Sequence, residues 1–136
     1  MRVGSEVDNG AQAPTSDKSH NDCPGRVLYR HVAGRWAGPI VLELWPEPLR
    51  FHRLRDALPG ISEKVLAQNL RELVRDGLVT RTVEPTRPPQ VTYSLTQLGN
   101  DLASQIHGLL TWVGNHTPEV LAARRRHDEQ QQQQAS

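Results

Sequence analysis

The sequence has little cysteine and few aromatic residues, and these shortages exclude several classes of protein. A single cysteine among 136 residues can form neither an internal disulfide nor a Cys-x-x-Cys pair. No apolar run approaches the ~18 residues that a membrane-spanning helix needs, and the N-terminus lacks the apolar segment of a signal peptide. We therefore expect a soluble, cytoplasmic protein of one domain, with no membrane partner.

Motifs for catalysis and metal binding are absent too. The sequence contains no glycine-rich phosphate loop after a strand and no His-Glu-x-x-His, and its six histidines are scattered. Cys23 with His20 or His31 offers a nucleophile pair in principle, but nothing marks an oxyanion site or a substrate pocket. The sequence therefore predicts no enzyme, no catalytic residue, no metal and no cofactor.

The net charge of +1 conceals an uneven distribution along the chain. Residues 49–93 hold eight Lys/Arg against five Asp/Glu, whereas residues 1–48 and 94–136 each hold one acid more than bases. This positive bias is weaker than that of many nucleic-acid binders, but it falls on one segment.

The centre of that segment has the pattern of an amphipathic helix from Ser62 to Gly77. Ser62 is a good N-cap, Gly77 suits the position after the C-cap, and apolar residues recur at helical spacing between them: Leu66, Leu70, Leu73 and Val74. Long polar side chains share the opposite face: Lys64, Gln68, Arg71 and Arg75. Taken alone, this face is typical of a solvated helix.

The neighbouring segments change that interpretation. A short strand at 49–51, a helix at 52–58 and a Pro59–Gly60 turn precede the amphipathic helix, which is the pattern of a helix-turn-helix. After Gly77, residues 78–83 and 90–95 predict a hairpin, with a proline-rich loop that carries Arg87 near its tip. Together they predict a winged helix-turn-helix and favour DNA binding.

Several stretches resemble one known family. They are Gly34–Trp36, Leu49–Phe51, Leu54, Pro59–Ser62, Leu66, Leu70, Leu73, Asp76–Val79, Pro88–Pro89, Tyr93–Thr96 and Leu98–Gly99. These residues resemble the HxlR-type winged-helix regulators, bacterial and archaeal relatives of the MarR-type proteins. The resemblance covers residues 23–115 and implies a dimeric, DNA-binding transcriptional regulator. The Trp45–Pro48 stretch departs from the simpler, glycine-containing turn that is common in the family.

The predicted fold class is α+β, mainly α, with a two-stranded wing and C-terminal dimerisation helices. Residues 1–22 are expected to be a disordered tail, and 23–115 the DNA-binding domain, with short helices at 24–34 and 35–45. A helix over 97–113 carries the expected dimerisation stripe: Leu102, Ile106, Leu109, Leu110 and Val113. A break at Gly114–Asn115 separates it from a second dimerisation helix over 116–127, and 128–136 reads as a disordered polar tail that follows three arginines.

We expect a homodimer that binds double-stranded DNA at a pseudo-palindromic operator, at the nucleoid, in a repressor-like manner. Ser62 would hold a phosphate, and three residues would reach base edges: Lys64, Gln68 and Arg71. Arg50, Arg75 and Arg87 would contact the backbone. Two alternatives stay open. One is a winged helix used only for protein interaction. The other is a redox or electrophile sensor, because some members of the resembled family use a cysteine at the place of Cys23, here beside Arg26 and a helix start. The sequence does not identify an effector.

Overall fold

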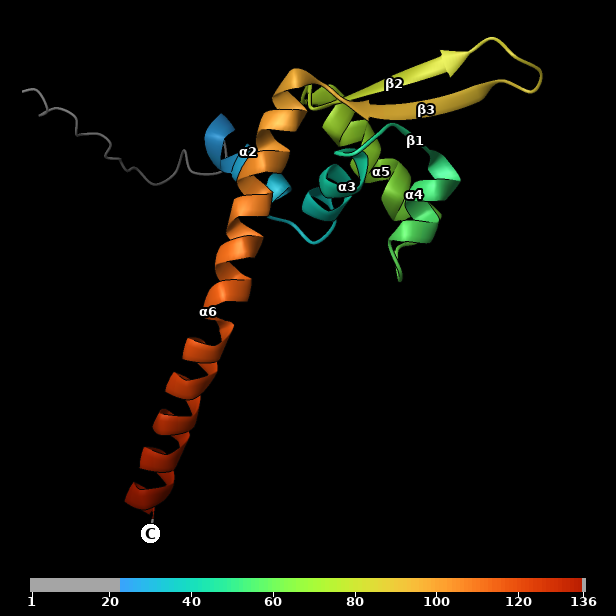
Figure 1. The fold of residues 1–136 in the computed structure, drawn as a ribbon. Coiled ribbons are helices and arrows are strands. Elements are labelled where there is room, and N and C mark those ends of the chain that lie inside the picture. The colour runs from blue at the N-terminus through green and yellow to red at the C-terminus, as the bar shows by residue number, and fades with distance from the viewer. Residues whose placement is uncertain (1–22, 136) are drawn as a thin grey trace, which may run out of the picture. The chain divides into compact units, whose positions relative to one another are not determined.

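The computed structural model describes residues 23–135, so the predicted disordered tail at 1–22 lies outside the described residues. The elements along the chain (Figure 1) are α2 (Pro24–Val32), α3 (Ala37–Leu44), β1 (Leu49–Arg50), α4 (Phe51–Ala57), α5 (Glu63–Arg75), β2 (Val79–Glu84), β3 (Gln90–Leu95) and α6 (Gln97–Ala135). The chain forms two compact units that divide between Gly38 and Pro39. The first contains α2, and the second contains the helix-turn-helix, the sheet and α6.

Helix α2 confirms the short helix predicted at residues 24–34. Pro24 occupies the first helical turn, where its missing N–H costs nothing, and Arg30 and His31 lie in the last turn, where positive charge suits the helix dipole. None of its residues is buried, and its exposed apolar side chains include Val27 and Leu28.

The core of the second unit forms where three helices converge. Leu66, Leu70 and Leu73 of α5 are at most 1% exposed, which confirms the apolar face predicted from their spacing. They share the core with buried residues of the two preceding helices: Ile40, Val41, Leu44 and Leu54. Helix α3 begins at Ala37, later than predicted, and Pro39 lies in its first turn as expected.

The sheet has three antiparallel strands in the order β1-β3-β2, so the short strand before α4 joins the predicted hairpin. Its register pairs Leu49 with Tyr93 at one edge, and Val79 with Leu95 at the base of the hairpin. Val79 is buried whereas the rest of β2 is exposed. The hairpin therefore projects from the core as a wing (Figure 1).

The C-terminal end of α5 is fixed by backbone hydrogen bonds that require glycine. The N–H of Leu78 donates to the carbonyl of Leu73 and that of Gly77 donates to Val74, while Gly77 has φ +77°. This Schellman motif satisfies carbonyls that the helix end would otherwise leave without partners. The predicted end of the helix at Gly77 is confirmed, and β2 leaves it in a fixed direction.

The beginning of α6 is anchored to the same turn. The hydroxyl of Thr96 caps α6 by accepting from the N–H of Gly99 at 3.0 Å, and it donates to the carbonyl of Gly77 at 2.7 Å. The N–H of Thr96 also donates to the carbonyl of Leu78 at 3.1 Å. A Cβ on Gly99 would lie 2.1 Å from the Leu78 oxygen, so only glycine fits at this crossing.

The predicted helix break at Gly114–Asn115 is wrong, because α6 runs without interruption from Gln97 to Ala135 with Pro118 inside it. Pro118 removes the backbone donor to the carbonyl of Gly114, and the two side chains before it bond to carbonyls that precede Gly114. The hydroxyl of Thr117 donates to the carbonyl of Val113 at 2.6 Å, and Nδ1 of His116 lies 2.8 Å from the carbonyl oxygen of Trp112.

The structure also differs from the sequence prediction at the C-terminal tail. Residues 128–135, predicted to be disordered, continue α6. Glutamine, glutamate and alanine are good helix formers, so a helix that is already nucleated can extend through them.

Replacing Gly99 with alanine tests the crossing between α6 and Leu78. We expect Gly99→Ala to lower the free energy of unfolding by about 1–3 kcal/mol, because the new methyl group meets a backbone oxygen that cannot turn away. Gly114→Ala on the same helix is the matched control. Its Cβ meets nothing within 4 Å, so it should leave stability unchanged or raise it by up to ~1 kcal/mol. Urea unfolding at one fixed protein concentration measures both, and equal effects would refute the proposed crowding.

Candidate nucleic-acid interface

The outer face of α5 presents a line of long polar side chains to solvent. They are Lys64, Gln68, Arg71 and Arg75, all exposed, and they lie opposite the three buried leucines of the helix. Helical spacing places them above one another over about three turns. The sequence-predicted face is therefore assembled, and its side chains can donate hydrogen bonds over a length suited to a groove.

The start of α5 combines a side-chain cap with free backbone donors. The hydroxyl oxygen of Ser62 accepts from the N–H of Val65 at 3.1 Å, which confirms Ser62 as the N-cap. The other N–H groups of the first helical turn have no acceptor within the helix, and they point outward with the positive end of the helix dipole. Because Ser62 is exposed, its hydroxyl can still donate to an oxygen of an approaching anion.

An ion pair that sequence analysis missed joins the two helices of the helix-turn-helix. Nη1 of Arg55, on α4, donates to Oε2 of Glu63, the first residue of α5. The nitrogen Nε of Arg55 also lies 3.5 Å from a carboxylate oxygen of Asp56. The hydrogen bond to Glu63 raises the pKa of the Arg55 guanidinium above its usual value, as expected for an ion pair that stabilises the charged form.

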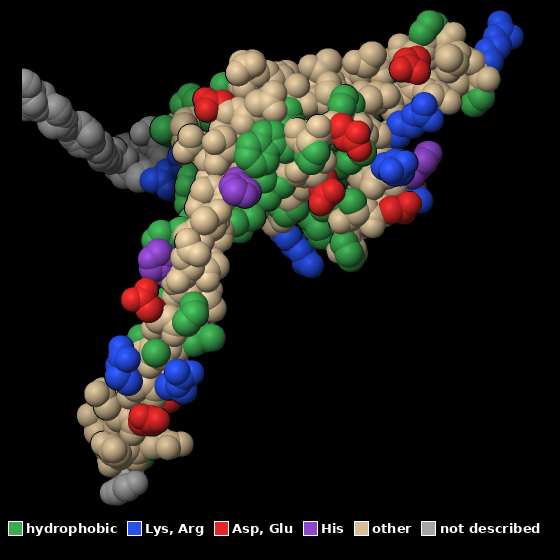
Figure 2. All heavy atoms as spheres, in the orientation of Figure 1, with side chains coloured by type: hydrophobic (Ala, Val, Ile, Leu, Met, Phe, Trp, Pro, Cys, Tyr) green, Lys and Arg blue, Asp and Glu red, His purple; other side chains and the backbone are tan. Residues whose placement is uncertain are grey.

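The wing carries exposed basic side chains beyond the core. Arg87 lies in the loop after β2, where the Thr86 hydroxyl donates to the carbonyl of Pro88 at 2.8 Å and the Thr86 N–H donates to Glu84 at 2.8 Å. Arg81, which sequence analysis did not single out, is also exposed on β2. Figure 2 shows Lys and Arg side chains at the far end of the wing and over α4, with acidic side chains between them.

Arg50 is exposed at the junction of β1 and α4, in the same unit as α5 and the wing. Arg53 and His52 on α4 are exposed next to it and were not predicted as site residues. The local excess of positive charge between residues 49 and 93 was visible in the sequence. This charge excess could have indicated Arg53 as a candidate DNA-binding residue. It could not have shown which basic residues of the segment contribute most to binding.

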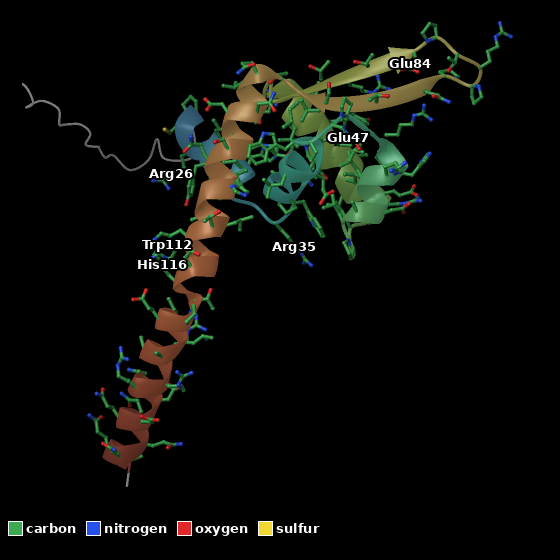
Figure 3. All side chains as sticks on the ribbon, viewed as in Figure 1. Arg26, Arg35, Glu47, Glu84, Trp112 and His116 are labelled. Atoms are coloured by element: carbon green, nitrogen blue, oxygen red, sulfur yellow. The ribbon has the colours of Figure 1, made fainter. Side chains whose placement is uncertain are left out.

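Helix α6 carries a series of exposed apolar side chains. Leu109 is 62% exposed, and further apolar side chains along the helix are also exposed: Leu110, Trp112, Val113, Val120 and Leu121. Leu102 and Ile106, predicted for the same stripe, are half-buried. The rings of Trp112 and His116 stack at 4.3 Å between centroids on one side of the helix (Figure 3). Apolar surface of this extent is typical of a protein–protein contact.

The remaining sequence-predicted candidate, Cys23, is exposed directly before α2. Across residues 23–135, no three His, Cys, Asp or Glu side chains gather closely enough to hold a metal ion. Within the same residues, no helix is both apolar and long enough to cross a bilayer.

Comparison with known proteins identifies this arrangement. The family model described as HxlR-like helix-turn-helix matches residues 31–120. The chain belongs to the HxlR family. The HTH-type transcriptional regulator YtfH of Escherichia coli strain K12 is 38% identical over 120 residues, which cover 88% of this chain and 95% of YtfH.

Solved structures of similar proteins have the same fold. A putative transcriptional regulator ytfH from Salmonella typhimurium superimposes with a TM-score of 0.69 at 40% identity, covering 77% of this chain and 94% of that one. The redox regulator HypR in its oxidised form gives a TM-score of 0.63 at 32% identity, covering 68% and 96%. This HxlR-family chain is thus a transcriptional regulator with a MarR-like winged helix-turn-helix, and not an enzyme. The fold class and the family predicted from sequence are confirmed.

Proposed function

We propose that this HxlR-family regulator binds double-stranded DNA as a homodimer and represses transcription by occupying an operator. The observation that carries the proposal is the exposed polar face of α5 above its buried leucines. A helix of this width fits the major groove of B-DNA, where every base pair offers a distinct pattern of donors and acceptors. Binding to the chromosome would place the protein at the nucleoid in the cytoplasm.

Three side chains of this face are suited to reading bases. The guanidinium of Arg71 can donate two hydrogen bonds to guanine, and the amide of Gln68 can both donate to and accept from adenine. Lys64 lies near the N-terminus of α5. The N-terminal residues of a recognition helix are those that contact base edges. Ser62 and the free N–H groups beside it are suited to a phosphate.

Arg50, Arg75 and Arg87 are assigned to the DNA backbone. Arg75 lies at the last position of α5, and Arg87 lies in the wing loop beyond the sheet. Contacts of this kind release counterions from DNA, so they set affinity and salt dependence and do not distinguish sequences.

A second copy of the chain is the partner we assign to the exposed apolar side chains of α6. Pairing of α6 helices would cover Leu109, Leu110 and Val113, together with the half-buried Leu102 and Ile106. A twofold dimer would present two α5 helices to one side of the DNA, about 34 Å or a multiple of that apart. The operator would then be a pseudo-palindrome with that half-site spacing.

A thiol-based response is a second candidate function, because Cys23 is exposed and precedes the first turn of α2. The similarity to the redox regulator HypR supports the same assignment. With one cysteine in the chain, oxidation would give either a disulfide between subunits or a mixed disulfide with a small thiol.

Substitutions of Arg71 and Arg87 separate base reading from backbone contact. We expect Arg71→Ala to cost about 1–3 kcal/mol on DNA enriched by the wild-type protein and less on random DNA, which relaxes specificity. Arg87→Ala should weaken binding to both alike and reduce the slope of affinity against salt by about one. Fluorescence anisotropy titrations at several salt concentrations measure both effects. Equal losses on enriched and random DNA for both variants would contradict the base-reading role of Arg71.

A charge on the apolar surface of α6 tests the dimer. Leu109→Asp should convert the dimer into monomers in sedimentation equilibrium, because a buried carboxylate without a partner opposes association. Thr111→Asp is the matched control, since Thr111 is exposed on the opposite side of the same helix. A Leu109→Asp variant that stays dimeric would exclude this surface as the interface.

The thiol proposal is tested by treating the protein with diamide before DNA titration. Oxidation should release enriched DNA from the wild-type protein and leave Cys23→Ser bound. Release of both proteins, or of neither, would exclude Cys23 as the switch.

A further inference from the structure

Glu63 is an acidic residue at the N-terminus of α5. In the proposed function, this end of α5 lies nearest to the bases. It is the first residue of the helix, and side chains at that position point back past the helix start. Its side chain is 62% exposed. The helix dipole favours a carboxylate here, but the phosphates of DNA would repel it, so its presence at a DNA-binding face opposes non-specific binding.

The carboxylate of Glu63 is held from one side. Arg55 of α4 donates to its Oε2, and the Arg55 side chain is only 39% exposed, with a second carboxylate, that of Asp56, 3.5 Å away. The guanidinium therefore lies between the acids of two helices. It compensates the charge of Glu63 and fixes the direction of one oxygen, which leaves Oε1 for a donor outside the protein.

Few groups in the major groove can donate to such an oxygen. An ionised carboxylate only accepts hydrogen bonds, whereas guanine and thymine present acceptors at their hydrogen-bonding edges. Adenine offers an amino group, but its N7 acceptor lies beside it and would face the carboxylate. Cytosine presents only the donor of its N4 amino group on its own major-groove edge, and Glu commonly accepts from that group, so cytosine is the base that matches.

We propose that Glu63 reads a cytosine in each half-site and that Arg55 is the residue that positions it. This assignment rests on the proposed function, since it requires α5 to enter the major groove. It adds a specificity-determining residue to the recognition helix and gives the ion pair between α4 and α5 a role in recognition. An exposed ion pair would contribute little to folding by itself.

The test is selection of DNA from a pool of random duplexes by the full-length wild-type protein and by Glu63→Gln. The wild-type pool should contain a C·G pair at one fixed position in each half-site. Glutamine both accepts and donates, which matches adenine, so the Glu63→Gln pool should carry A·T or no preference there. Replacing the cytosine should cost the wild type about tenfold in affinity and Glu63→Gln less than twofold.

Glu72→Gln is the matched control, because it removes the same charge from an exposed position farther along α5. It should tighten binding to all DNA slightly and leave the selected base unchanged. If Glu63→Gln selects the wild-type motif, or if Glu72→Gln changes that base, the assignment is refuted while DNA binding stands. A wild-type protein that enriches no motif would instead refute the proposed function itself.

The positioning role of Arg55 is tested by substituting it both in the wild-type protein and in the Glu63→Gln variant. Arg55→Met should lower discrimination at the cytosine position in the wild-type protein but have no effect on that discrimination in Glu63→Gln. Arg55→Lys keeps the positive charge but loses the planar set of donors of the guanidinium. It should retain part of the discrimination at the cytosine position. A purely structural role would instead weaken binding to every sequence equally in both backgrounds, and that result would refute the positioning role.

Discussion

The crossing of α6 over the Gly77–Leu78 turn is the constraint on which the arrangement of the second unit depends. Thr96 bonds to the carbonyls of both turn residues, and Gly99 leaves room for the Leu78 oxygen. The turn ends α5 and starts β2, so one small region fixes the recognition helix, the wing and the long C-terminal helix. Each hydrogen bond is modest by itself, but the three elements cannot shift independently while the crossing holds.

This connection gives the proposed regulator a physical route from assembly to DNA. If α6 helices pair, their crossing angle sets the separation of the two α5 helices, because α6 is attached where α5 ends. Covering apolar surface on α6 would then stabilise the dimer and fix the half-site spacing. An effector that alters the pairing of α6 would alter DNA affinity without touching the recognition helix.

Local sequence patterns predicted the elements of the interface better than their connections. The Ser62 cap, the leucine spacing of α5 and Gly77 each act within a few residues, so they could be read directly. The Thr96–Gly77 hydrogen bond spans 19 positions and the Arg55–Glu63 pair spans a turn, so both depend on packing that no local pattern encodes. The continuity of α6 was missed because glycine and proline disfavour the interior of a helix, whereas α6 contains both Gly114 and Pro118.

The most direct measurement is binding of the full-length protein to DNA from upstream of its own gene, against random DNA of equal length, at low and at higher salt. If the proposed regulator reads DNA sequence, affinity for both fragments should fall as salt rises, while a specific complex with the upstream fragment survives at higher salt. Equal and feeble binding to both fragments at both salt concentrations would contradict it. The polar face of α5 would then be a solvated surface, and the apolar side chains of α6 would indicate a module for protein interaction.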